Sequence, residues 1–231
     1  MLDEEAKALQ EVAKATGKTV DLAQATGELL YDIFGESLHQ FGGIVSDWMR
    51  YFRYRNLLVV TDKVKDIHTS RSILGKAVPI PPEYVLPLLD GVSLEAEGSV
   101  QDMWAGLIAN ATDPSSEYRI KKVFIEILRG LEPLDARTLE CLGDPALDEK
   151  YSILTGATFN ADTIASCLDA DETEIKLSLQ TLARYGCVID SWENTLEGID
   201  MGYSGFRVNN PNSNFRLSHL GKQLLAATKR T

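Results

Sequence analysis

The chain has 231 residues, of which 44% are hydrophobic and 25% charged, values typical of a globular protein with one large or two small domains. Its 34 acidic residues outnumber the 23 basic ones, and the net charge of −11 argues against broad, non-specific attraction to nucleic acid. No stretch approaches the roughly 18 continuous apolar residues of a membrane-spanning helix. The acidic first ten residues are not typical of a signal peptide. Three widely spaced cysteines predict neither a disulfide framework nor a zinc site, and indicate a reduced, cytoplasmic protein.

An apolar stripe follows one face of the segment 2–55, which is predicted to be helical. Its seven members are spaced three or four residues apart: Leu30, Phe34, Leu38, Phe41, Val45, Trp48 and Phe52. Gly35, Gly42 and Gly43 interrupt this segment, although glycine destabilises a helix interior by about 1 kcal/mol relative to alanine. We interpret these glycines as a hinge or as a place where another helix approaches closely.

The charge of this segment changes sign near residue 48. Residues 28–47 carry four acidic residues and no Lys or Arg, whereas residues 48–55 (WMRYFRYR) carry three arginines and no acid. Interleaved aromatic and arginine side chains suit a lipid interface or a partner surface. The predicted membrane or partner surface is therefore Trp48, Arg50, Phe52, Arg53 and Arg55. The simpler interpretation of the apolar stripe itself is that it packs into the core of a helical bundle, as aromatic stripes at helical spacing usually do.

Helical segments separated by proline and glycine follow. Helices are predicted at 56–67, after Pro82, at 101–111, at 117–130 and after Pro133, where Gly143-Asp144-Pro145 ends the last. The 101–111 segment has core spacing in its apolar residues: Met103, Trp104, Leu107, Ile108 and Ala111.

Beyond residue 147 the pattern becomes helix, helix, strand, polar hairpin, strand, helix. The two β-like runs are 187–189 and 215–217, and four residues fit helix ends: Asn160, Asp171, Gly186 and Ser218. This order is typical of a winged helix-turn-helix. The predicted fold is therefore mainly α, with an N-terminal helical bundle (1–146) followed by a small winged helix-turn-helix domain (147–231).

The predicted recognition helix offers Lys176, Gln180 and Arg184 to base edges. However, Glu172 and Glu174 lie at the end that usually enters the groove. Residues 151–231 contain nine acidic and seven basic residues, a net charge of −2, whereas DNA-binding domains are usually basic. We therefore expect a module that contacts protein and binds DNA weakly. A DNA-binding regulator is kept as the alternative.

The sequence lacks the common phosphate-loop, zinc-protease and nucleophile-elbow motifs. Its histidines are isolated from one another: His39, His68 and His219. Asp171, Glu174 and Lys176 form the best nuclease-like fragment, since paired carboxylates beside a lysine can hold Mg²⁺. A capped helix with solvated charges is the simpler interpretation, and a solvated polar face is likewise expected for Asp62, Asp66 and His68. We expect no catalytic, cofactor or metal site, and a metal-dependent nuclease is the third alternative.

Three segments between residues 81 and 142 combine distinctive packing and turn signatures. They are PPEYVLPLLDGVS, VQDMWAGLIANATDP and VFIEILRGLEPLDARTLECL. Through these segments the chain resembles the abortive infection alpha proteins of bacteria, within the range 81–142, which spans 62 of its 231 residues. The resemblance implies defence against phage through arrest or death of the infected cell, and it implies no catalytic residues.

The predicted function is therefore non-enzymatic phage defence. The protein is expected to act through helix rearrangement or through contact with a partner protein, a second copy of the chain or a membrane. The winged-helix domain would serve as a sensor or docking module. The predicted location is the cytoplasm, with peripheral contact at the inner membrane as the alternative.

Overall fold

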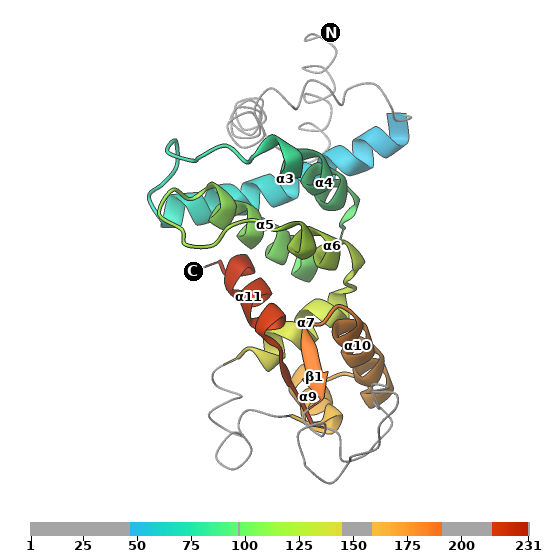
Figure 1. Ribbon diagram of the computed structural model, residues 1–231. Helices are drawn as coiled ribbons and strands as arrows, with labels where there is room; N and C mark the ends of the chain where they lie inside the picture. The colour runs from blue at the N-terminus through green and yellow to red at the C-terminus, as the bar shows by residue number, and fades with distance from the viewer. Residues whose placement is uncertain (1–46, 97, 145–158, 191–213, 231) are drawn as a thin grey trace. The chain divides into compact units, whose positions relative to one another are not determined.

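The protein is described here by a computed structural model that covers residues 47–96, 98–144, 159–190 and 214–230 (Figure 1), with the backbone alone for residues 47–52. Within these ranges the chain forms eight helices and two short strands, so the predicted mainly helical class is confirmed. Contacts divide the chain into two units. The first runs to Arg129 and resumes at Ala227, and the second is Gly130–Ala226.

The first unit is built from four helices: α3 (Asp47–Ser70), α4 (Pro82–Leu94), α5 (Gly98–Thr112) and α6 (Lys122–Gly130). Helix α3 packs against both α4 and α5. Almost every residue of α5 from Val100 to Asn110 is buried, and the Trp104 side chain is fully enclosed. Helix α5 is therefore the centre of this unit's core, as the apolar spacing of 101–111 predicts.

Proline and polar caps set the helix boundaries where the sequence predicts them. Helix α4 begins at Pro82, because the fixed φ of proline suits a first helical turn. Helix α5 ends at Thr112, one residue before Asp113-Pro114. Helix α7 (Pro133–Leu142) begins with a capping box in which Asp135 accepts from the Glu132 backbone.

Two predicted boundaries are wrong. Helix α3 continues through residues 55 and 56, where the sequence suggested separate helices, because neither glycine nor proline interrupts it. Its buried side chains also follow one helical face without a gap, as Thr61, Val64 and His68 show. Helix α6 begins at Lys122 instead of residue 117, because Asp113 accepts from Ser115 and turns the chain before the helix starts.

The second unit contains α7, α9 (Ala161–Leu168), α10 (Glu172–Arg184), β1 (Val188–Asp190), β2 (Phe215–Leu217) and most of α11 (His219–Thr228). Strands β1 and β2 are antiparallel, with Val188 opposite Leu217. Phe159 adds an isolated bridge to Phe215 through two backbone hydrogen bonds of 2.8 and 2.7 Å. The predicted order of helix, helix, strand, strand and helix is therefore observed.

The helix ends of the second unit follow their predicted chemistry. The side chains of Asn160 and Asp171 accept from backbone amides at the starts of α9 and α10, and Ser218 does so for α11. Gly186 adopts φ +71° after α10, a conformation that glycine reaches without strain.

Contacts place α7 in the second unit, since this helix packs on α9 and α10. The division between the two units therefore falls at Gly130. The boundary predicted between residues 146 and 147 lies outside the described residues, as do the hinge glycines Gly35, Gly42 and Gly43 and the polar hairpin at 191–213. No helix among the described residues is long and apolar enough to cross a membrane.

Candidate functional site

The arginine and aromatic surface predicted at residues 48–55 begins helix α3. For Trp48, Arg50 and Phe52 the structure describes only a helical backbone. Arg53 is half-buried and pairs with Asp90 of α4 at 3.6 Å. Asp90 also accepts from Arg129 of α6 at 2.8 Å, so Arg53 takes part in a contact among three helices of its own unit. Arg55 is exposed.

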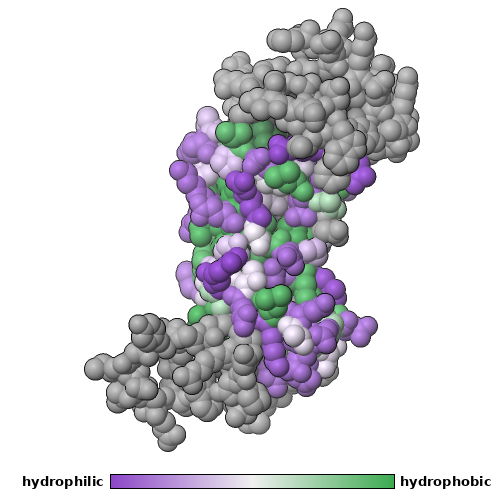
Figure 2. Space-filling view, turned by 90° about the vertical axis from the view of Figure 1, so that its right-hand side faces the viewer, coloured by the Kyte–Doolittle hydropathy of each residue, from purple (hydrophilic) through white to green (hydrophobic). Residues whose placement is uncertain are grey.

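The predicted recognition residues share helix α10, and Gln180 and Arg184 are exposed. Lys176 pairs with Glu172 one turn earlier at 2.7 Å, which partly neutralises its charge. Leu177 follows Lys176 in this helix, and 63% of its residue surface is exposed, which the sequence pattern did not indicate. Figure 2 shows hydrophobic side chains as separate patches among hydrophilic ones on the face in view.

The nuclease-like fragment folds as a helix start. The Asp171 side chain accepts from the backbone amides of Thr173 and Glu174, and these hydrogen bonds, chiefly with Thr173, lower its pKa. Lys176 is paired with Glu172, as described above, and not with Asp171 or Glu174, the two carboxylates of the nuclease-like fragment. Among the described residues no group of three His, Cys, Asp or Glu side chains is placed to hold a metal ion.

Two of the three thiols are buried and held in the protonated state. Burial raises the pKa of Cys141 to about 12, and its interaction with the Cys167 thiol contributes to this. Burial also raises the pKa of Cys187 to about 11. Because the thiolate is the nucleophile, neither buried cysteine is an activated one.

His68 is not part of a solvated face with Asp62 and Asp66, so that prediction is wrong. Asp66 is exposed, but His68 is 0% exposed. Its Nε2 lies 2.9 Å from Thr112 Oγ1. The Thr112 hydroxyl donates its single proton to the Ile108 carbonyl, so we assign the proton of the ring to Nε2 of His68. Burial lowers the pKa of His68, which keeps the ring neutral.

Next to His68, Arg71 connects α3 to the end of α5. Its guanidinium donates to Asn110 Oδ1 at 2.8 Å and to Asp113 Oδ2 at 3.3 Å. Burial would raise the pKa of Asp113, but hydrogen bonds from Ser115 and the charge of Arg71 outweigh it, and the pKa is lowered. We call His68, Arg71, Asn110, Thr112 and Asp113 the α3–α5 polar cluster.

The polar cluster holds the last two residues of α11 and the two residues that follow it, 227–230, which we call the strap. Asn110 Nδ2 donates to the carbonyl oxygens of Ala227 at 2.8 Å and Lys229 at 3.0 Å. Arg71 Nη2 donates to the same Lys229 oxygen at 3.3 Å. Gly106 of α5 lies against the strap backbone, since a Cβ there would fall 1.8 Å from the Thr228 oxygen. All of these residues belong to the first unit.

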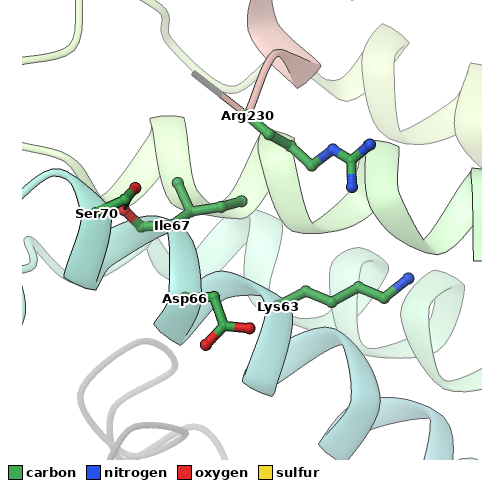
Figure 3. Close-up of a pocket in the computed structure, with 5 residues that line it drawn as sticks. All are labelled: Lys63, Asp66, Ile67, Ser70 and Arg230. Carbon is green, nitrogen blue, oxygen red and sulfur yellow. Dashed lines mark hydrogen bonds between the residues drawn. The ribbon is translucent and has the colours of Figure 1, made fainter.

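An ion-pair network continues from the strap to α3. Asp102 of α5 accepts from Lys63 at 2.6 Å and pairs with Arg230 at 3.0 Å. A groove of about 320 Å³ lies beside this network, lined by Lys63, Asp66, Ile67, Ser70 and Arg230. Figure 3 shows Arg230, from the chain after α11, facing α3 across this groove. The arrangement binds a chain segment and offers no activated nucleophile among the described residues.

The family described as abortive infection alpha matches residues 54–228 of the chain. The chain belongs to this family. No curated protein and no solved structure matches it. The abortive infection alpha match spans the polar cluster and all of α11.

The abortive infection alpha segments were predicted to serve packing and turns, and the roles of Gly106, Asn110 and Arg71 were not predicted. A signal was present, because a glycine and an asparagine stand within the otherwise apolar segment WAGLIANA. Both residues are unfavourable in a helix interior relative to alanine. Their contacts with the strap explain why an apolar helix contains them.

Proposed function

We propose that this protein defends bacterial cells against phage by abortive infection and that it does so without catalysis, by contacting a partner protein. The observation that carries the defence role is the family match over 175 residues, 54–228. The protonated state of Cys141 and Cys187, whose pKa values burial raises, agrees with a role in binding.

The second unit is proposed to be a winged helix-turn-helix. The observed order of α7, α9, α10, β1 and β2 supports this. The bridge between Phe159 and Phe215 supports it further, because it adds a third strand position, before α9, to the β1–β2 pair. Helix α10 would then occupy the place of a recognition helix.

Three features of α10 favour a protein partner over DNA. Leu177 is 63% exposed and offers no hydrogen-bonding group to a base edge. Lys176 is paired with Glu172, which reduces its attraction for phosphate. Asp171, Glu172 and Glu174 place three carboxylates at the start of this helix. A DNA-binding regulator is the second candidate, favoured by the exposed Gln180 and Arg184.

Residues 27–55 are proposed as the effector element. It would contact a partner, a second copy of the chain or the membrane surface through Trp48, Arg50, Phe52 and Arg55, and Gly35, Gly42 and Gly43 would permit a change of helix packing. The alternation of arginine with aromatic residues supports this assignment. Arg53 is better assigned to internal packing, because it pairs with Asp90.

A plating assay tests the proposed defence. Cells that express the protein should give fewer plaques than cells with an empty vector, across a panel of unrelated phages. The variant Arg55→Gln should keep its thermal stability, since Arg55 is exposed and exposed charges contribute little, and it should lose protection. Equal plaque numbers with and without the protein, for every phage, would refute the defence role.

A further inference from the structure

The strap, residues 227–230, is held mostly through its backbone. Asn110 and Arg71 donate to the carbonyl oxygens of residues 227 and 229. One ion pair, between Arg230 and Asp102, adds a side-chain contact. Hydrogen bonds from side chains to backbone carbonyls can be exchanged for water at modest net cost. The strap can therefore open without unfolding the unit that holds it.

Burial within the strap is graded. Ala227 and Thr228 are buried, whereas Lys229 and Arg230 are exposed and follow the end of α11. The apolar area that anchors the strap is thus small compared with that of α5, which is buried over most of its length. Segments with few buried apolar contacts are the first to open locally.

Helix α5 is shaped to receive the strap. Gly106 leaves room for the Thr228 carbonyl, which a Cβ at this position would meet at 1.8 Å. Alanine would favour the helix itself by about 1 kcal/mol, so glycine here serves the strap contact at the expense of helix stability. The buried amide of Asn110 is aimed at the same segment from one turn further along α5.

We propose that the strap is a releasable latch, closed on α5 in the resting protein and opened when the protein acts. This inference rests on the proposed function, because a protein that kills or arrests an infected cell must stay inactive in an uninfected one. Opening would free the end of α11 and expose Gly106, Asn110 and the groove beside Lys63. The first two strap residues end α11, which begins in the second unit, so a partner bound to the earlier turns of α11 could act on the latch through the helix itself.

Trypsin cleavage of the full chain measures the opening directly, because Lys229 and Arg230 lie in the strap. Asn110→Ala should accelerate cleavage after Lys229 about tenfold, since cleavage follows the population of the open form. Asn56→Ala is the matched control. Asn56 is also a buried amide of the first unit that donates to a backbone carbonyl, that of Ser93, but it does not touch the strap.

A second variant distinguishes opening of the strap from unfolding of the whole protein. Gly106→Ala displaces the strap while favouring helix α5, and Gly98→Ala makes the same change in the same helix with nothing within 4 Å of the new Cβ. Circular dichroism and thermal melting establish that all four variants are folded. Faster cleavage in Asn110→Ala and Gly106→Ala, with parental cleavage in both controls, is expected. Parental cleavage in every variant would overturn the latch.

Growth of uninfected cells tests whether opening of the strap activates the protein. Expression of Asn110→Ala or Gly106→Ala should slow growth without phage, and expression of Asn56→Ala or Gly98→Ala should not. If the strap opens in the trypsin assay while growth and phage protection stay parental, the latch has no regulatory role, and the proposed function survives. If the parent fails to protect against any phage, the proposed function fails, whatever the trypsin result.

Discussion

The side-chain amide of Asn110 donates to the carbonyl oxygen of Ala227 over 2.8 Å, although 117 positions separate the two residues in the chain. The same amide donates to Lys229, and its oxygen accepts from Arg71. Both amide hydrogens and the amide oxygen of this buried side chain are therefore satisfied. One polar residue in an apolar helix thus fixes where the end of α11 lies.

Gly106→Ala should lower the free energy of unfolding by about 1–3 kcal/mol, because the new methyl group would overlap a backbone atom of the strap. Gly98→Ala should leave stability unchanged or raise it by up to about 1 kcal/mol, since its Cβ meets nothing. Urea denaturation followed by circular dichroism measures both. Equal effects at the two positions would contradict the placement of the strap against α5.

His68 should make stability fall in acid. Burial lowers its folded-state pKa below the ordinary value of 6.5, so the unfolded chain binds the proton more readily. The free energy of unfolding is therefore fully retained above pH 6.5. It falls as the pH drops below 6.5, by up to about 1.4 kcal/mol per pH unit.

Urea midpoints on both sides of pH 6.5 measure this effect. His68→Gln should flatten the dependence between these conditions, whereas His219→Gln, at an exposed position, should leave it intact. A dependence that persists unchanged in His68→Gln would show that another group titrates there.

The chemistry of helix ends made much of the second unit predictable. Each residue that begins or ends a helix here acts within four residues of its own position, so a short stretch of sequence is enough to predict the helix boundary. These residues are Asn160, Asp171, Gly186 and Ser218. The β-like runs were equally local. The register that pairs Val188 with Leu217 was not predicted, because the order of elements does not fix which residues face one another.

The polar cluster was not predictable in the same way. Asn110 and Ala227 are far apart in sequence, and no periodicity connects them. His68 was missed for a different reason, because its charge-bearing neighbours suggested a solvated face. Its spacing of four from the buried Val64 places it on the buried side of α3.

Leu177→Gln should leave thermal stability within about 0.5 kcal/mol of the parent, because the side chain is mostly exposed. It should nevertheless reduce phage protection, if α10 contacts a protein partner through this residue. Leu86→Gln is the matched control, since Leu86 is also an exposed helical leucine, at 51%, but lies on α4. Equal protection by Leu177→Gln and the parent would remove Leu177 from the partner surface.

Duplex DNA should bind the full chain weakly or not at all. Fluorescence anisotropy with random duplex at low salt measures this binding, and the carboxylates at the start of α10 are the physical reason. Salt-sensitive binding below micromolar concentration that is lost in Gln180→Ala with Arg184→Ala would establish the DNA-binding regulator instead.

The purified protein should leave RNA, DNA and ATP intact in the presence of Mg²⁺ or Mn²⁺. Lys176 is paired with Glu172, and Asp171 caps its helix, so this fragment is not arranged as a metal site. Gel and chromatographic assays of each substrate measure hydrolysis. Cleavage that disappears in both Glu174→Ala and Lys176→Ala would support a nuclease.

A single round of infection, with every cell infected, shows whether the protein acts by abortive infection. The survival of infected cells and the number of phage released per cell are measured together, with and without the protein. Abortive infection predicts that cells containing the protein die or stop dividing and release fewer phage than cells without it. Infected cells that survive and resume division, or an unreduced phage yield, would show that the protein does not act by abortive infection.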